Sequence, residues 1–216
     1  PLGDGGVIVT TNSDGVIKYD RDGVEIWEQY NFSSFTSSQL WSLIETPSGL
    51  IGVGTDYNNG YLAAFSHNGE VIADEMLVER SPWLYDIVKS SDGGYYICGS
   101  RYGVDDMEDL LIMKISFFPE VDEPPEIEIL WSEVFGGEAS DRAYGMILSD
   151  DGNITIAGRT SSYGNGQNDL WLLKMGEGYI APPPPPPTLV INEFLALNGN
   201  CCTDSQGDND DYIELF

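Results

Sequence analysis

The 216-residue chain carries 36 acidic and 9 basic residues, which gives a formal net charge of −27 at pH 7. This charge argues against nucleic acid and anionic membranes as partners, because both would be repelled, and no apolar run approaches the ~18 residues of a membrane span. Hydrophobic residues make up 41% and aromatic residues 12% of the chain, which excludes a disordered polypeptide and is ample for a packed core.

A short apolar stretch that follows a glycine turn recurs along the chain. Its copies lie at residues 5–11, 48–55, 93–100 and 151–159, and the turn glycines are Gly6, Gly49, Gly94 and Gly152. The glycines are spaced by 43, 45 and 58 residues. Spacings of this size are typical of repeat architectures and predict a repeat protein.

Each repeat predicts four short strands in a fixed order. The first repeat begins at the glycine stretch and lacks the aromatic-led strand that precedes this stretch in the other repeats. The aromatic-led first strands are expected at 41–44, 85–88 and 144–147, the third strands at 15–19, 60–65, 109–115 and 169–175, and the fourth strands at 24–27, 70–73 and 126–131. The third strands are the longest apolar runs, so we expect both of their faces to be buried.

The last of these fourth strands is delayed by an insert at residues 117–125, which contains Pro119, Pro124 and Pro125. We expect this insert to form an elongated loop. Four antiparallel strands per repeat, without any helical period, predict an all-β fold and the blades of a partial β-propeller. Residues 1–178 supply about three and a half blades. Propellers typically close with about four to eight blades, so we expect further sequence before Pro1.

The composition changes at Ala181, where six prolines follow at residues 182–187. We interpret residues 179–188 as an extended linker. Residues 189–216 contain two strand patterns around an acidic loop and are expected to begin a second, truncated domain. Cys201 and Cys202 in this loop could form a vicinal disulfide, remain two free thiols or pair with cysteines outside the chain. Cys98 is expected to be a buried strand residue.

Two stretches of the chain resemble known families. The repeats resemble those of secreted bacterial β-propeller proteins, and the residues that carry the likeness read DGGYYICG (92–99), DLWLLK (169–174) and DGVEIW (22–27). Residues 190–196 (VINEFLA) and 210–215 (DDYIEL) resemble the opening strands of lamin-tail domains of secreted bacterial proteins. This second resemblance implies an immunoglobulin-like sandwich that binds or anchors and has no catalytic residues.

The outer-strand tryptophans Trp27 and Trp131 are also similar to those of quinoprotein repeats, which bind pyrroloquinoline quinone. Ile72 takes the tryptophan place in the second repeat, so this likeness is weak and no cofactor is expected.

The sequence offers no catalytic or metal-binding constellation. The single histidine, His67, precedes Asn68 and Gly69 and is expected in an exposed turn, and a second histidine that could complete a metal or nucleophilic site does not exist. Calcium takes six to eight oxygen ligands, which three acidic clusters could supply in part, although we favour a simple hairpin turn for the first cluster and solvated loops for the other two. These clusters are Asp20 with Asp22, residues 105–109 with Glu108, and residues 204–211.

We therefore expect a secreted or cell-surface binding or scaffolding module that is not itself an enzyme, with a protein or a carbohydrate as its ligand. The alternative is the accessory region of a larger secreted hydrolase or of a kinase similar to spore-coat protein H, with the catalytic domain outside this chain. The sequence does not identify the ligand.

Overall fold

The computed structural model describes residues 2–11, 15–30, 38–57, 59–81, 83–103, 106–118, 126–164, 167–176 and 191–193. Every regular element in these residues is a β-strand, which confirms the all-β prediction. The strands are β1 (Val7–Thr11), β2 (Gly15–Tyr19), β3 (Glu25–Tyr30), β4 (Ser38–Thr46), β5 (Gly49–Asp56), β6 (Asn59–Ser66), β7 (Val71–Val78), β8 (Trp83–Lys89), β9 (Tyr95–Tyr102), β10 (Glu108–Phe118), β11 (Glu126–Phe135), β12 (Asp141–Leu148), β13 (Asn153–Thr160), β14 (Asp169–Gly176) and β15 (Ile191–Glu193).

The strands form four antiparallel sheets that follow one another along the chain. The first sheet contains β1 to β3, the second β4 to β7, the third β8 to β11, and the fourth β12 to β15, each in sequence order. Within the described residues the first sheet has no counterpart of β4, β8 and β12, as the sequence predicts. Each sheet therefore corresponds to one repeat, and the hairpin turns between consecutive strands determine the strand order.

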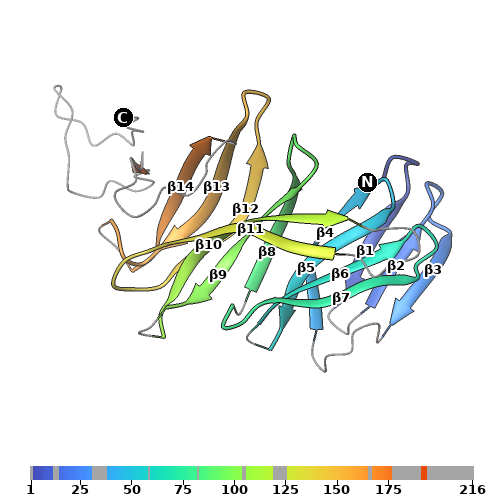
Figure 1. The fold of residues 1–216 in the computed structure, drawn as a ribbon, viewed down its shortest axis with the longest axis horizontal. Helices are drawn as coiled ribbons and strands as arrows, with labels where there is room; N and C mark the ends of the chain where they lie inside the picture. Colours follow the sequence, from blue (N-terminus) through green and yellow to red (C-terminus); the bar gives the residue numbers. More distant parts are fainter. Residues whose placement is uncertain are drawn as a thin grey trace.

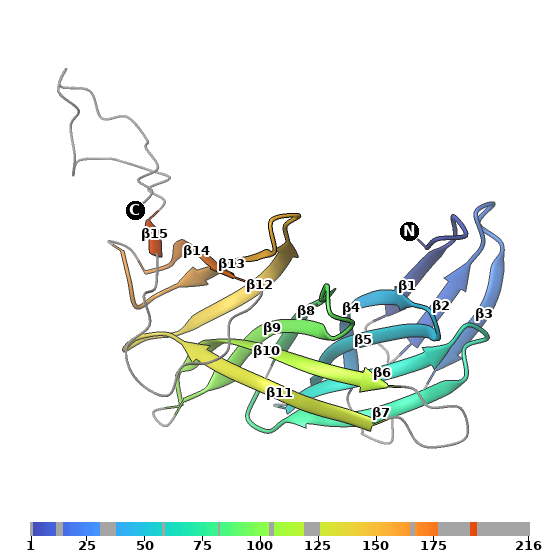
Figure 2. The same ribbon diagram turned by 45° about the horizontal axis from the view of Figure 1, so that its top comes forward.

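The sheets follow one another along the long axis of the molecule (Figure 1) and pack face to face along an arc that is open on one side (Figure 2). The first strands β4, β8 and β12 lie on the concave side of the arc, whereas β3, β7 and β11 lie on its convex side (Figure 2). The concave edges of β4, β8 and β12 are called the inner rim below.

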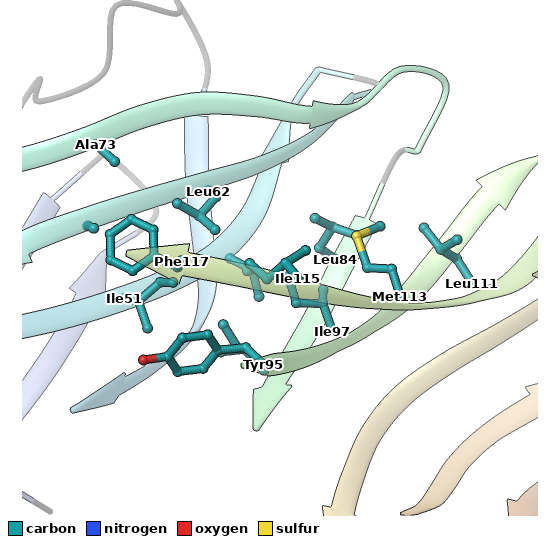
Figure 3. Close-up of a cluster of buried hydrophobic side chains, with 13 residues drawn as sticks. Ile51, Leu62, Ala73, Leu84, Tyr95, Ile97, Leu111, Met113, Ile115 and Phe117 are labelled. Carbon is teal, nitrogen blue, oxygen red and sulfur yellow. The ribbon is translucent and has the colours of Figure 1, made fainter. Parts of the chain in front are cut away.

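Three apolar cores hold the four sheets together, one at each junction between neighbouring sheets. The middle core joins the second and third sheets. It contains the fully buried residues Ile51, Leu62, Leu84, Ile97 and Met113 (Figure 3). Burying each such side chain stabilises the fold by roughly 1.5–3 kcal/mol.

Strands β5 and β6 of the second sheet are buried along nearly their whole length, and β10 of the third sheet is buried from Leu110 to Phe117, so the prediction that both faces of the third strands are buried is confirmed in these two sheets. It is wrong for β14 at the end of the stack, where buried Trp171 and Leu173 alternate with exposed or half-buried positions and Leu170 is 44% exposed.

The insert at residues 117–125 begins later than the sequence predicts. Phe117 and Phe118 belong to β10 and pair with Ile127 and Glu126 of β11, so the expectation of a loop from residue 117 is wrong. Phe117 is buried in the middle core, because the alternation of Met113, Ile115 and Phe117 continues the apolar face of β10. The hairpin of β10 and β11 is thus longer than its counterparts. Residues 119–125 lie outside the described residues.

Strand pairing also refines the alignment of the repeats. Ile8, Ile51, Tyr96 and Thr155 face Lys18, Ala64, Lys114 and Lys174, respectively, on the next strand. Gly6, Gly49 and Gly94 then occupy one equivalent position, but its counterpart in the fourth sheet is Asn153 rather than Gly152. In the fourth sheet the turn accepts Asn153 at this position because Gly152, not Asn153, adopts the positive φ of that turn.

The fourth sheet is completed from a distant part of the sequence. Ile191, Asn192 and Glu193 pair with Leu173, Leu172 and Trp171 of β14, so part of the segment that resembles a lamin-tail strand supplies the fourth strand of this sheet. The predicted linker at 179–188, the remainder of the lamin-tail segment and Cys201 and Cys202 lie outside the described residues.

Candidate ligand-binding surface on the inner rim

Each complete first strand contains one extra residue at the same place. The register between first and second strands shifts between Leu40 and Ser42, between Leu84 and Asp86, and between Ala143 and Gly145. The extra residues are Trp41, Tyr85 and Tyr144. A β-bulge bends its strand and redirects the side chain of the extra residue, so each of these three sheets places one aromatic ring at the inner rim.

A glycine of the second strand accommodates each bulge. A Cβ atom on Gly54, Gly99 or Gly158 would overlap the carbonyl oxygen of Gln39, Trp83 or Arg142, respectively. The first strand approaches the second so closely at this point that only glycine fits. This contact explains why a glycine recurs next to the last residue of the repeated stretch, as Gly54, Gly99 and Gly158.

The three bulge residues and Trp83 form a continuous row of aromatic side chains across three sheets. The ring centroids of Trp41 and Tyr85 are 6.0 Å apart, and those of Tyr85 and Tyr144 are 5.1 Å apart. Trp83 stacks on Tyr85 at 6.0 Å with an interplanar angle of 18°. Trp41 and Tyr144 are each 43% exposed. We call Trp41, Trp83, Tyr85 and Tyr144 the aromatic row.

Asp86 ties the inner rim together next to the aromatic row. One carboxylate oxygen accepts hydrogen bonds from the hydroxyl of Ser42 in β4 and from the backbone N–H of Ile87, each at 2.9 Å. The other oxygen accepts the backbone N–H of Met146 in β12, also at 2.9 Å. The Asp86 side chain therefore joins the first strands of three sheets and helps to fix the spacing of the aromatic rings that these strands carry.

A partly buried ion pair lies at one end of the row. Arg142 in β12 donates two hydrogen bonds to the carboxylate of Glu108 in β10, from Nε and from Nη2, the latter at 2.6 Å. Gln39 and Arg142 each precede a bulge residue by two positions, as Trp83 precedes Tyr85 and stacks on it, so they are the counterparts of Trp83 in the second and fourth sheets. Burial raises the pKa of the nearby Tyr85 hydroxyl, so this hydroxyl stays protonated at neutral pH.

The acidic clusters that could have held calcium serve other roles where the structure describes them. Asp20 accepts the N–H groups of Asp22 and Val24 at 2.9 and 2.8 Å, which is a hairpin turn. Asp106 pairs with Arg80 at 2.5 Å and Glu108 pairs with Arg142, so the carboxylates of the second cluster face different cations. Within the described residues no group of three potential ligands could hold a metal ion. Residues 204–211 lie outside the described part.

The other residues that the sequence brought into consideration have structural roles. His67 lies in the exposed turn after β6, with Nε2 3.1 Å from the carbonyl oxygen of Pro47, as predicted. Cys98 is fully buried and free, and burial raises the pKa of its thiol well above the ordinary value. Both predictions are confirmed.

The outer-strand tryptophans pack against neighbouring structure. Trp27 Nε1 donates to the carbonyl oxygen of His67 at 3.0 Å, which joins the first and second sheets, and Trp131 packs on Tyr96 with ring centroids 6.0 Å apart. Trp27 and Trp131 pair with Lys18 and Lys114, and the counterpart in the second sheet is Ala73. The sequence-based placement of Ile72 there is wrong by one residue because Ile72 is the extra residue of an outer-strand bulge.

Three repeats share an ion pair between a turn aspartate and the third-strand lysine. The pairs are Lys18 with Asp4 at 3.2 Å, Lys114 with Asp92 at 2.5 Å and Lys174 with Asp151 at 3.6 Å. The hydrogen bond from Lys114 lowers the pKa of Asp92 to about 2. Because the same pair recurs at the same turn in three sheets, we interpret it as a structural feature that stabilises the hairpin turns rather than as part of a binding site.

Comparisons with known proteins do not assign a family. No protein-family model matches the chain, and no curated protein is significantly similar to it. The functional interpretation therefore rests on the geometry of the inner rim.

The sequence predicts aromatic-led strands but does not by itself mark them as a site. The available signal was the recurrence of an aromatic residue at one repeat position, in Trp41, Tyr85 and Tyr144. The spacing of these residues alone does not show the pairing registers that create the bulges. It also does not show how separate sheets stack and bring the rings together.

No helix in the described residues is long and apolar enough to cross a membrane.

Proposed function

We propose that this chain is a non-enzymatic binding module of the extracellular space or cell surface, that its repeats are blades of a partial β-propeller, and that its ligand contacts the aromatic row. Four sheets with one repeat each, stacked along an arc, support the propeller interpretation. The two ends of the stack also support it. Val7 and Val9 of the first sheet and Ile147 and Leu170 of the fourth are exposed on the end faces, as in a repeat array without capping units.

The observation that carries the binding function is the exposed aromatic row. Trp41 and Tyr144 expose ring surface on the concave side, and the amide of Gln39 and the guanidinium of Arg142 belong to the same rim. Aromatic faces stack on apolar ligand surfaces, and amide and guanidinium groups hydrogen-bond hydroxyl groups. This combination suits a carbohydrate, whose rings present C–H faces and hydroxyl edges. The charge of −27 disfavours polyanionic glycans.

The direct test is binding of a panel of neutral oligosaccharides, followed by titration calorimetry. We expect a neutral oligosaccharide to bind, and the Trp41→Ala variant to bind it about tenfold more weakly or worse, because truncating an aromatic anchor typically costs more than about 1 kcal/mol. The control variant Tyr57→Ala removes an exposed tyrosine from the turn after β5 and should bind normally. Unchanged affinity in Trp41→Ala, or no binding to any neutral glycan, would contradict the carbohydrate assignment.

The alternative is that the chain is the accessory region of a larger secreted hydrolase or kinase. The same aromatic row would then target that enzyme to its substrate or surface. Both versions predict the same binding by the isolated chain and differ in whether the complete polypeptide carries a catalytic domain. The lamin-tail assignment of residues 189–216 and the extracellular location belong to the proposal in either version.

A further inference from the structure

The fourth repeat departs from the others at two positions that lie two residues apart. Strand pairing places Asn153 where the other three sheets have glycine, and Thr155 where they have a large apolar residue. The apolar residues are Ile8, Ile51 and Tyr96. Residues 153–155 consequently read NIT, which is the pattern of an N-glycosylation acceptor in secreted proteins. Both residues that define the pattern are therefore specific to the fourth repeat.

The other sheets have no room for a side chain at the position of Asn153. A Cβ atom on Gly49 or Gly94 would overlap the backbone carbonyl oxygen of Phe65 or Ile115, respectively. In the fourth sheet the opposite residue is Gly176, and Oδ1 of Asn153 lies 3.9 Å from the place that a Cβ atom of Gly176 would take. The local backbone of the fourth sheet thus accommodates a side chain that its counterparts exclude.

Asn153 directly follows a solvent-exposed turn. Ser149 N–H donates to the carbonyl oxygen of Asn153 at 2.8 Å and closes the turn around Asp150 and Asp151, which are both exposed. The corresponding turn residues 91–93 are also exposed, although the third sheet packs against neighbouring sheets on both sides. The exposure of the turn therefore does not result from the place of the fourth sheet at the end of the stack.

The side-chain amide of Asn153 points toward this turn. It donates a hydrogen bond that lowers the pKa of the Asp151 carboxyl, and the Asp151 side chain is 57% exposed. Residues i and i+2 of a strand lie on the same face, so Thr155 lies on the same face of β13 as Asn153. Only a hydrogen bond at the protein surface has to break to free the amide nitrogen.

We propose that Asn153 is an N-glycosylation site. The donor is an oligosaccharide linked to a lipid through a diphosphate, and an oligosaccharyltransferase catalyses the transfer. Nδ2 of Asn153 forms a bond to the anomeric carbon of the sugar and loses one proton, while the bond from this carbon to the diphosphate breaks and the lipid diphosphate leaves. The attached glycan would cover the turn end of the fourth sheet.

This proposal requires the extracellular location proposed above but not the carbohydrate-binding function. The aromatic row and Asn153 belong to different parts of the sheet, and binding to the row is measured separately. A failure of one proposal consequently leaves the other unaffected.

The test is peptide mapping by mass spectrometry of the intact chain, secreted behind an added leader by a eukaryotic host. A glycoprotein with a known occupied site, secreted by the same host, serves as the reference. We expect most copies of Asn153 to carry an oligosaccharide. Its removal by peptide N-glycosidase in heavy-oxygen water should leave labelled aspartate at position 153. An unmodified Asn153 beside a modified reference protein would overturn the proposal. Mapping by peptide keeps a second match to the pattern, at residues 31–33 outside the described residues, separate.

Two variants of Thr155 separate recognition of the pattern from adventitious modification. Thr155→Ala removes the hydroxyl that the pattern requires and should abolish modification of Asn153, whereas Thr155→Ser keeps a hydroxyl and should retain it. Thr155 is only half-buried, so both variants should fold, which circular dichroism would check. Equal occupancy of Asn153 in the two variants would contradict the assignment.

Discussion

Gly99 determines how closely β8 can approach β9. A Cβ atom at this position would overlap the carbonyl oxygen of Trp83 and contact Leu84. Because the overlapping atom belongs to the backbone of Trp83, the overlap can be relieved only by moving β8, and the ring of Tyr85 would move with it. The repeat therefore depends on glycine at this position for packing, independently of any positive φ.

We predict that Gly99→Ala lowers the free energy of unfolding by about 3 kcal/mol or more, the upper end of overpacking effects. The matched control is Gly145→Ala in the β12 bulge, where the nearest atom to an added Cβ is 3.7 Å away on Asp86. It should change stability by less than about 1 kcal/mol. Urea denaturation of both variants measures the difference. Equal stability of the two variants would refute the close approach between β8 and β9.

Asp92 couples folding to acid pH. The pKa of its carboxyl is lowered from 3.8 to about 2 by hydrogen bonds from Lys114 and then Ser90. A carboxyl with a depressed folded-state pKa contributes stability above its unfolded pKa, near 4, and loses it as the pH falls toward 2. Because the Asp92 side chain is 60% exposed, screening limits the contribution to less than about 1 kcal/mol.

We therefore predict that the melting temperature of Asp92→Asn falls less steeply between pH 5 and pH 2 than that of the unmodified chain. High salt should reduce the difference, because it screens a pair of this exposure. Thermal unfolding across this pH range measures both effects. Parallel pH profiles for the two proteins would show that the ion pair does not contribute.

At the scale of elements, the first strands depend on Asp86 for their alignment. We predict that Asp86→Ala destabilises the chain by about 1–3 kcal/mol, because the backbone N–H of Met146 then loses its partner in a partly buried place. Ser42→Ala removes only the bond to β4 and should cost about 1 kcal/mol or less. Chemical denaturation gives both values. A larger loss of unfolding free energy for Ser42→Ala than for Asp86→Ala would contradict the role of Asp86 in aligning the first strands.

The order of the elements could be predicted from the sequence because each strand is bounded by a turn signal and the pattern recurs. The glycine stretches, the long apolar third strands and the missing first strand of repeat one all follow from this recurrence. The extension of β10 could not be predicted in this way. Pro119, Pro124 and Pro125 indicate a loop, and only packing of Phe117 on the second sheet shows that the strand continues.

The aromatic row could not be predicted from strand patterns, because these patterns contain neither the pairing register nor the stacking of the sheets. Alternation along a single strand predicts where Tyr85 points only if the register is regular, and the bulge between Leu84 and Asp86 breaks that register. The contact between Tyr85 and Tyr144 also joins two sheets, so it depends on how the repeats stack. A repeat position that is aromatic in three copies is the sequence feature that could have drawn attention to it.

At the scale of the whole molecule, the inner rim is formed by the stacking of neighbouring sheets. No single sheet contains the row, since Trp41, Tyr85 and Tyr144 come from the second, third and fourth sheets. The proposed carbohydrate surface lies beside these first strands and requires the arc that the three cores maintain. It consequently depends on the relative placement of neighbouring sheets.

The most direct test of this placement is a nuclear Overhauser experiment on the chain with labelled tyrosine and tryptophan rings. We predict cross-peaks from Tyr85 to both Trp41 and Tyr144, whose centroids lie 6.0 and 5.1 Å away in neighbouring sheets. The internal reference is Tyr96 with Trp131, 6.0 Å apart within the third sheet. A cross-peak for the reference pair without either inter-sheet cross-peak would contradict the stacked arc and the aromatic row with it.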